Sequence, residues 1–171
     1  MNRKDIAIEN FKKGYNCSQS IVLAFSDLVN INEKDLLKIA SSFGGGMGRL
    51  RETCGAVSGC FIIIGLLYGY DEPESGELKA QLYERIQEIG LDFEKNQGSL
   101  ECRQLLNLKE KHSSYIPTPR TKDFYETRPC ANLIGYAAEI LEEYIKKTQL
   151  LNKISLLVTI LLINIAYAII Y

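Results

Sequence analysis

The sequence predicts an all-α fold, a compact multi-helix bundle with a glycine-rich loop before a buried central helix and an apolar helix at the C-terminus. Three observations lead to this prediction. Apolar residues recur at helical spacing through most of the 171 residues. A run of four glycines and one methionine at 44–48 interrupts that periodicity, and the stretch that follows it at 54–70 carries no charge.

Composition limits both the architecture and the class of function. A chain of 171 residues with 46% hydrophobic residues is long enough to bury a core as one domain, expected at 1–148, with an apolar helix at 149–171. Lys+Arg (20) nearly balance Asp+Glu (21), which gives no reason to expect a nucleic-acid partner. The first residues lack the apolar run of a secretory signal, so we expect the body in a reducing cytoplasm.

Three helices are predicted before the glycine-rich run, at 4–13, 17–28 and 33–43. The first stops at Gly14, and Asn16 is a suitable N-cap for the second. Cys17 then lies at the N-terminal end of the apolar face of that second helix. Residues 44–48 cannot form a helix interior at reasonable cost, because glycine loses more backbone entropy on folding than any other residue.

Residues 54–70 are predicted to form the central helix, with Thr53 as its N-cap. Glycines recur along it at spacings of four and six, which leaves small faces where other helices can approach. A buried core helix is the interpretation favoured by its 17-residue length, and a membrane span is the alternative.

A long helix at 74–96 and a short one after Ser99 follow. The long helix has a predicted core stripe of Leu78, Leu82, Ile86, Ile89 and Phe93. Residues 107–128 are polar, contain two prolines and show no clear period. A stretch of this kind is either a lid or binding loop or a mobile surface connection. Pro129 suits the first position of the last body helix, whose apolar face begins at Cys130.

The C-terminal segment 154–171 carries no charge over 18 residues. At 1.5 Å per residue it would span about 27 Å, close to a hydrocarbon core of ~30 Å. Three lysines precede it, so the positive-inside rule places the body on the cytoplasmic side of the cytoplasmic membrane. A last apolar helix packed on the body or on a second subunit is the alternative, and a homo-oligomer stays open.

Four of the five cysteines share one position in the predicted helices, the first turn. They are Cys17, Cys54, Cys102 and Cys130. Unpaired N–H groups and the positive end of the helix dipole favour a thiolate there. Arg49, Arg51 and Arg103 lie beside these cysteines in sequence and are expected either to stabilise thiolates or to be solvated. Cys60 does not share the position and is expected to be a buried core thiol.

These motifs resemble one known family. Gly14-Tyr15-Asn16-Cys17-Ser18-Gln19, the run 43–48, Cys54-Gly55-Ala56-Val57-Ser58-Gly59, Cys102-Arg103-Gln104-Leu105-Leu106 and Cys130 are similar to the C_GCAxxG_C_C family of redox-active four-cysteine proteins. The resemblance covers about residues 4–147 and selects the same four cysteines as helix position does. It implies redox activity, and members are often encoded near transporters. Cys60 and the apolar tail lie outside the family pattern.

Three functions remain open from the sequence. The first is electron transfer through Cys17, Cys54, Cys102 and Cys130, as redox-active thiols or as ligands of a [2Fe–2S] cluster with Cys₄ ligation. Backbone amides of the glycine-rich segments would then offset the cluster charge, with Gly44, Gly45, Gly46, Gly55, Ala56 and Gly59 as cofactor-binding residues.

The second is a thiol–disulfide oxidoreductase or redox sensor that uses Cys54 and a partner thiol. The third is a non-catalytic metal-binding module, with zinc as its metal, associated with a membrane transporter. The first two require a redox partner protein that the sequence does not name.

Overall fold

The computed structural model describes residues 2–170, with side chains through Ala166. Met1 and Tyr171 lie outside the described residues, and so do the side chains of 167–170. The last part of the predicted tail at 154–171 is therefore described by its backbone only, and its final residue not at all.

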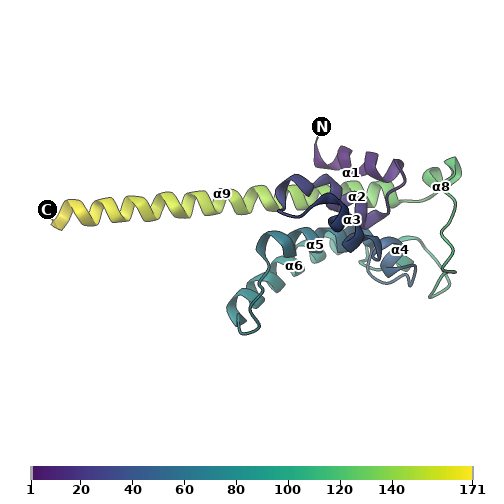
Figure 1. Ribbon diagram of the computed structural model, residues 1–171, viewed down its shortest axis with the longest axis horizontal. Coiled ribbons are helices and arrows are strands. Elements are labelled where there is room, and N and C mark those ends of the chain that lie inside the picture. The colour runs from purple at the N-terminus through teal and green to yellow at the C-terminus, as the bar shows by residue number, and fades with distance from the viewer. Residues whose placement is uncertain (1, 171) are drawn as a thin grey trace.

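Helices α2, α5 and α9 form the centre of the body (Figure 1). Helix α5 (Gly55–Tyr68) packs against α2 (Cys17–Ala24) and against the first half of α9 (Cys130–Ile170). Most side chains along the first ten residues of α5 are buried, so the interpretation of 54–70 as a central core helix is correct. The all-α prediction is also confirmed, since the described residues contain no strand and only an isolated bridge between Thr53 and Glu101.

Three further helices cover this centre. Helix α1 packs on α2 and α9, α3 packs on α2, and α6 packs on α5 and α9. Their bounds are Arg3–Lys12, Glu33–Ser41 and Gly76–Gln97. Only the second half of α6 lies on the body, because its first half points away from it (Figure 1). Leu78, predicted in the core stripe, is for that reason 51% exposed, whereas Ile89 and Phe93 are buried.

Shorter elements connect these helices. They are the 3₁₀ turn η1 (Ser26–Leu28), α4 (Gly44–Met47), α7 (Cys102–Leu105) and α8 (Lys122–Thr127). The second helix was predicted to continue to residue 28, but α2 ends at Ala24. The reason is that the Arg3 guanidinium donates to the Ala24 carbonyl at 2.6 Å and caps the helix there. The predicted loop 107–128 contains α8, which the sequence pattern missed.

The glycine-rich segment forms a tight turn instead of a regular helix. Within α4, Gly45 and Gly46 have φ of 66° and 70°, and Gly48 that follows has φ of 63°. Arg49 and Arg51 also have positive φ, at 71° and 68°. Non-glycine residues in this region are uncommon, and a run of them indicates a backbone that the surrounding structure holds in place.

The tail and the last body helix are one uninterrupted helix. Helix α9 leaves the body as a rod (Figure 1), and the side chains from Leu150 to Ala166 are exposed. In the described residues it is the one helix long and apolar enough to cross a membrane, and none of its apolar window is buried in the body. From Leu150 to Ala166 the tail does not pack on the body of the same chain, which was the alternative left open by the sequence.

Candidate functional site

Two backbone segments place Cys54 and Cys102 side by side. The N–H of Cys54 donates to the Leu100 carbonyl at 2.7 Å, and the N–H of Cys102 donates to the Glu52 carbonyl at 2.7 Å. As a result, Thr53 lies opposite Glu101 in an isolated antiparallel bridge. The N-cap of α5 is therefore Cys54 itself and not Thr53 as predicted.

Cys17 and Cys130 approach the same place from two other helix starts. Cys17 is the first residue of α2 and Cys130 the first of α9. A capping box fixes the start of α2, because the Asn16 side chain accepts from the Gln19 N–H and the Gln19 side chain accepts from the Asn16 N–H. The Asn16 amide also donates to the Ser41 carbonyl at 2.9 Å, which anchors this cap to α3.

The four helix-start cysteines border one small cavity of about 10 Å³. Apolar side chains of α7 and α9 complete its wall, namely Leu105, Leu106, Leu133 and Ile134. Cys60 lies outside this cavity, fully buried, and its thiol donates to the Ala137 carbonyl at 3.4 Å. All five cysteines lie among the described residues and are free thiols.

The four thiols of the cavity differ in acidity. Hydrogen bonding to the Cys17 thiol lowers the pKa of Cys130 to about 7, and the positive charges of Arg128, Arg120 and Arg51 act in the same direction. The same hydrogen bond, followed by burial, raises the pKa of Cys17 well above its usual value. The pKa values of Cys17 and Cys130 thus shift in opposite directions, and Cys130 is the more acidic of the two.

Burial governs the other two thiols of the cavity. It raises the pKa of Cys54 to about 12. It also raises the pKa of Cys102, although the Arg51 guanidinium at 3.7 Å from the Cys102 Sγ opposes this shift. The most acidic thiol of the site is therefore Cys130, and Cys54 ionises far less readily.

The six predicted cofactor-binding residues, five glycines and Ala56, differ in whether they border a cavity. Gly44 and Gly45 line a larger pocket next to the cysteine cavity, and Gly55 lines the cavity itself. A Cβ on Gly46 would lie 2.5 Å from the Cys102 Cβ, so Gly46 lets the turn pack against that cysteine. Three of the set, Gly46, Ala56 and Gly59, border neither cavity. Ala56 is buried in the core, and Gly59 packs against Ile21 of α2.

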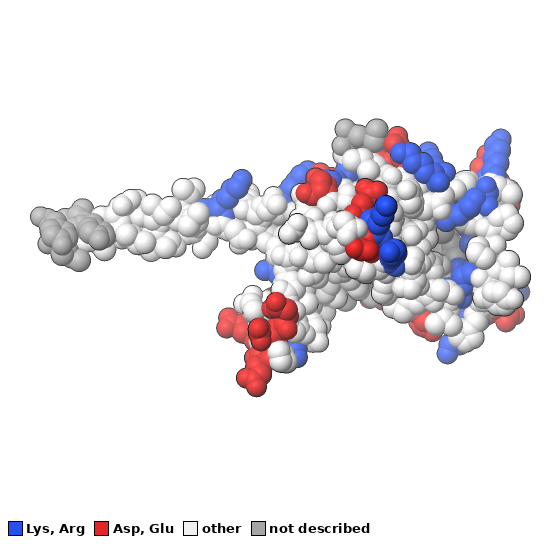
Figure 2. Space-filling model, in the orientation of Figure 1, with Lys and Arg blue, Asp and Glu red and all other residues white. Residues whose placement is uncertain are grey.

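The larger pocket has a volume of about 290 Å³ and is rich in arginine. Its lining includes Cys17, Cys102 and Cys130 together with four arginines, which are Arg49, Arg51, Arg120 and Arg128. No acidic side chain among the described residues lines it. Figure 2 shows basic side chains gathered at this end of the body, farthest from the tail. Cys17 and Cys130 thus line a pocket that also carries four arginines.

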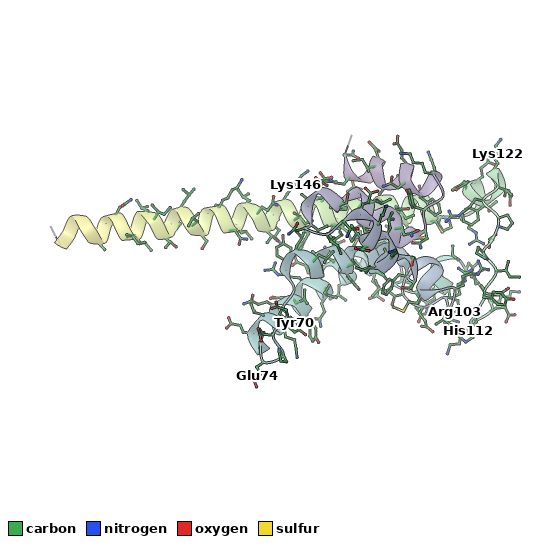
Figure 3. All side chains as sticks on the ribbon, viewed as in Figure 1. Tyr70, Glu74, Arg103, His112, Lys122 and Lys146 are labelled. Carbon is green, nitrogen blue, oxygen red and sulfur yellow. The ribbon has the colours of Figure 1, made fainter. Side chains whose placement is uncertain are left out.

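The stretch between α7 and α8 forms one wall of this pocket. Arg49 donates to the Ser114 carbonyl and, at 3.1 Å, to the Thr118 hydroxyl, and Arg51 donates to the Ser113 hydroxyl at 2.7 Å. The nearby His112 side chain lies at the outer edge of this end of the body (Figure 3). Of the two interpretations of 107–128, the structure therefore favours a loop that borders a binding pocket. Sequence reasoning named this loop but not Arg120 or Arg128 within it.

The donor set of the cavity matches a Cys₄ centre in chemistry but not in arrangement. Within the described residues, no three side chains of His, Cys, Asp or Glu are placed to hold one metal ion. The cavity of about 10 Å³ is about the size that one water requires. The residues as arranged do not fit a zinc ion or an iron–sulfur cluster, so we derive no chemical step through either.

Fold and site together define a class of protein, an all-α protein with four cysteines around one cavity. The comparison with known families agrees with this class. The model of the family described as "Putative redox-active protein (C_GCAxxG_C_C)" matches residues 15–144, which is more than half of the chain, and the chain belongs to this family. No curated protein and no solved structure matches it.

Proposed function

We propose that this protein transfers electrons by thiol–disulfide exchange, with Cys130 as the attacking thiol and Cys17 as its partner. The observation that supports this proposal most directly is the Cys17–Cys130 thiol pair that lines an open pocket. Both thiols lie at helix starts, where the helix dipole favours a thiolate. An exchange site needs two close thiols and a pKa near ambient pH for one of them, and this pair has both.

The exchange balances without a further reactant. The Cys130 thiolate attacks one sulfur of a disulfide R–S–S–R, a Cys130–S bond forms, and RS⁻ leaves with the proton of Cys17. The Cys17 thiolate then attacks the Cys130 Sγ, the intramolecular disulfide forms, and the second RS⁻ takes a proton from solvent. Two protein thiols are oxidised and one disulfide is reduced to two thiols. A dithiol partner protein would reverse these steps and return the site to its reduced form.

This assignment moves the attacking role from Cys54, the sequence-based hypothesis, to Cys130. A pKa of about 12 leaves almost no Cys54 thiolate at neutral pH, whereas a pKa of about 7 leaves Cys130 about half ionised. Cys54 also borders only the small cavity, while Cys130 borders the pocket as well. Access and acidity both favour Cys130.

We further propose that α9 attaches the body to the cytoplasmic face of the cytoplasmic membrane. The apolar window of α9 is bare on all sides, which is typical of a helix that contacts lipid. Lys146, Lys147 and Lys153 precede it on the side of the body. A membrane transporter is the partner that the family resemblance suggests for a body held in this position.

A cluster or metal function is the second candidate, because all four cysteines border one cavity. It requires the thiols to move from the arrangement seen here into a common ligand set. The chain purified without oxygen decides between the two. Iron and sulfide near two per chain would support a [2Fe–2S] cluster, and one zinc per chain without a redox titration would support a metal-binding module.

The exchange proposal is tested by equilibrating the metal-free protein in dithiol–disulfide buffers of defined potential and counting free thiols. We expect a two-electron transition in which the count falls from five to three. The C60S variant is a matched control, because Cys60 lies outside the cavity, and its count should fall from four to two. Five thiols that stay free across all potentials would overturn the proposal.

A further inference from the structure

The four arginines of the pocket differ from Arg3 and Arg103 in what they pair with. Arg3 forms an ion pair with Asp27, and Arg103 forms one with Glu101. In the described part of the chain, none of the four pocket arginines has a carboxylate partner within ion-pair distance. No carboxylate of the described residues therefore neutralises their charges.

Aromatic rings and neutral oxygens hold these guanidiniums in place instead. Arg120 lies over the rings of Phe11 and Phe124, at 4.6 Å from each centroid, and Arg128 lies 4.7 Å from the Phe124 centroid. Arg128 and Arg49 both donate to the Thr118 hydroxyl, at 3.5 and 3.1 Å. Stacking fixes the plane of a guanidinium and leaves most of its five N–H groups free to donate.

The thiols cannot neutralise this much positive charge. Cys130 supplies one negative charge when it ionises, against four guanidiniums that line the same pocket. Burial, and after it repulsion from Arg51 and Arg128, lowers the pKa of Arg49, which still remains protonated. Arg51 is only 4% exposed, so solvent does little to screen its charge. Clustered, poorly screened like charges are unfavourable unless an anion joins them.

We infer that the pocket binds a small disulfide that carries carboxylate groups, and that this is a substrate of the Cys17–Cys130 pair. The inference rests on the proposed exchange function for its redox part. The anion-binding part rests on the arginines alone. Four guanidiniums can donate bidentate hydrogen bonds to more than one carboxylate, which favours a ligand with two such groups. The volume of about 290 Å³ suits a small ligand and excludes a folded protein domain.

The position of the pocket fits this substrate class. Cys17 and Cys130 line it together with the arginines, so a carboxylate bound to the guanidiniums brings the rest of the ligand to the thiols. The step is the exchange already described. The Cys130 thiolate attacks one substrate sulfur, Cys17 closes the protein disulfide, and the substrate leaves as two thiols that carry its carboxylates.

The reactive part of the inference is tested with three small disulfides that differ in charge. They are the dianion 3,3′-dithiodipropionate, the neutral bis(2-hydroxyethyl) disulfide and the dication cystamine. Each rate of protein disulfide formation is divided by the rate of the same disulfide with a free small thiol, which removes intrinsic reactivity. We expect the normalised rate to be about tenfold higher for the dianion than for the neutral compound, and lowest for the dication.

The binding part is tested separately with suberate, a dicarboxylate of the same chain length as dithiodipropionate but with no sulfur to react. We expect calorimetry to show suberate binding that weakens about tenfold in R49Q, a loss of about 1.4 kcal/mol. R103Q is the matched control, because Arg103 lies near Cys102 but outside the pocket (Figure 3), and it should bind as the unchanged chain does.

The two tests separate failure of the inference from failure of the proposed function. Suberate binding without any disulfide exchange would leave the anion pocket standing and overturn the substrate assignment with the exchange function. Exchange at equal normalised rates for all three disulfides, with no suberate binding, would overturn the inference and leave the exchange function standing. Equal loss of binding in R49Q and R103Q would also overturn it, since it would show a general charge effect.

Discussion

The two halves of α9 lie in opposite surroundings, although they belong to one continuous helix. The first half begins at Cys130 and buries Ile134, Ala137, Ala138 and Leu141 against the other helices of the body. The second half, from Leu150 to Ala166, exposes leucines and isoleucines on every side. In Figure 2 it carries hardly any charged side chains.

In the functions proposed above, redox chemistry and membrane attachment belong to separate halves of one helix. The first half buries its apolar side chains against the body and exposes polar ones such as Glu143 and Lys146, so it requires no further partner. The second half leaves a large apolar surface that water solvates poorly, so it requires lipid or another chain. Each of the following predictions changes one of the two halves, or the site at the start of the first, and asks whether the other responds.

Removal of the exposed second half of α9 should have the largest effect of the four changes, and the effect should be on membrane association. A chain that ends at Gln149 keeps the buried residues of α9 and loses the apolar window. We expect the full chain to sediment with membranes and the shortened chain to stay in the supernatant, which fractionation measures directly. The shortened chain should keep the thiol reactivity of the full chain. Equal sedimentation of both would contradict the proposed attachment.

Loss of the attacking thiol should have the next largest effect. In C130S, alkylation of the reduced body at pH 7 should slow by about a hundredfold, because burial still raises the pKa values of Cys17, Cys54 and Cys102 after the interaction of Cys17 with Cys130 is lost. Stopped-flow kinetics with a fluorescent alkylating reagent measures this rate. C54S is the matched control and should keep the fast phase. A fast phase that survives in C130S and disappears in C54S would return the attacking role to Cys54.

In the glycine-rich turn beside the site, a side chain at Gly46 should destabilise the fold. G46A should lower the free energy of unfolding by about 2 kcal/mol or more, because its Cβ would lie 2.5 Å from the Cys102 Cβ and its φ is positive. G98A has a positive φ too, but nothing lies within 4 Å of its Cβ. The difference between the two variants in chemical denaturation isolates the close contacts at Gly46, which are with the Cys102 Cβ and with the backbone of Arg51 and Glu52. Equal losses would show that these contacts contribute nothing.

The smallest predicted effect is a shift in acidity at Cys130. The rate of its alkylation should rise with pH through a midpoint near 7, because only the thiolate reacts and it forms above that pKa. C17A removes the thiol that donates to Cys130, so the midpoint should move to higher pH by about one unit. C60A should leave it unchanged. A midpoint that stays near 7 in C17A would assign the acidity to the arginines alone.

Much of the fold could be predicted from the sequence because helix signals are local. Periodicity placed most of the helices, and caps such as Asn16 together with Pro129 indicated that the four cysteines lie at helix starts, although Cys54 is the N-cap of α5 and not in its first turn. The prediction that Leu78 of α6 is buried was wrong, because periodicity shows which face of a helix is apolar but not how far the body extends along that helix. The end of α2 also depended on a distant partner, Arg3.

The candidate site depended on distant contacts even more strongly. Helix position and family motif both selected the four cysteines, and the structure brings them to one cavity. Nothing in the sequence showed that Cys17 and Cys130 would form a hydrogen bond with each other, since 112 residues separate them. Arg120 and Arg128 lie in a loop without a period, and only the tertiary structure brings them next to Arg49 and Arg51.

The central claim is that Cys17 and Cys130 form one reversible redox pair. Its most direct test is mass spectrometry of the peptides from the metal-free protein after mild oxidation and quenching with an alkylating reagent. We predict a disulfide between the Cys17 and Cys130 peptides that a dithiol reductant removes, with Cys54, Cys60 and Cys102 alkylated. A first disulfide that joins Cys54 to Cys102, or no disulfide at all, would contradict the account.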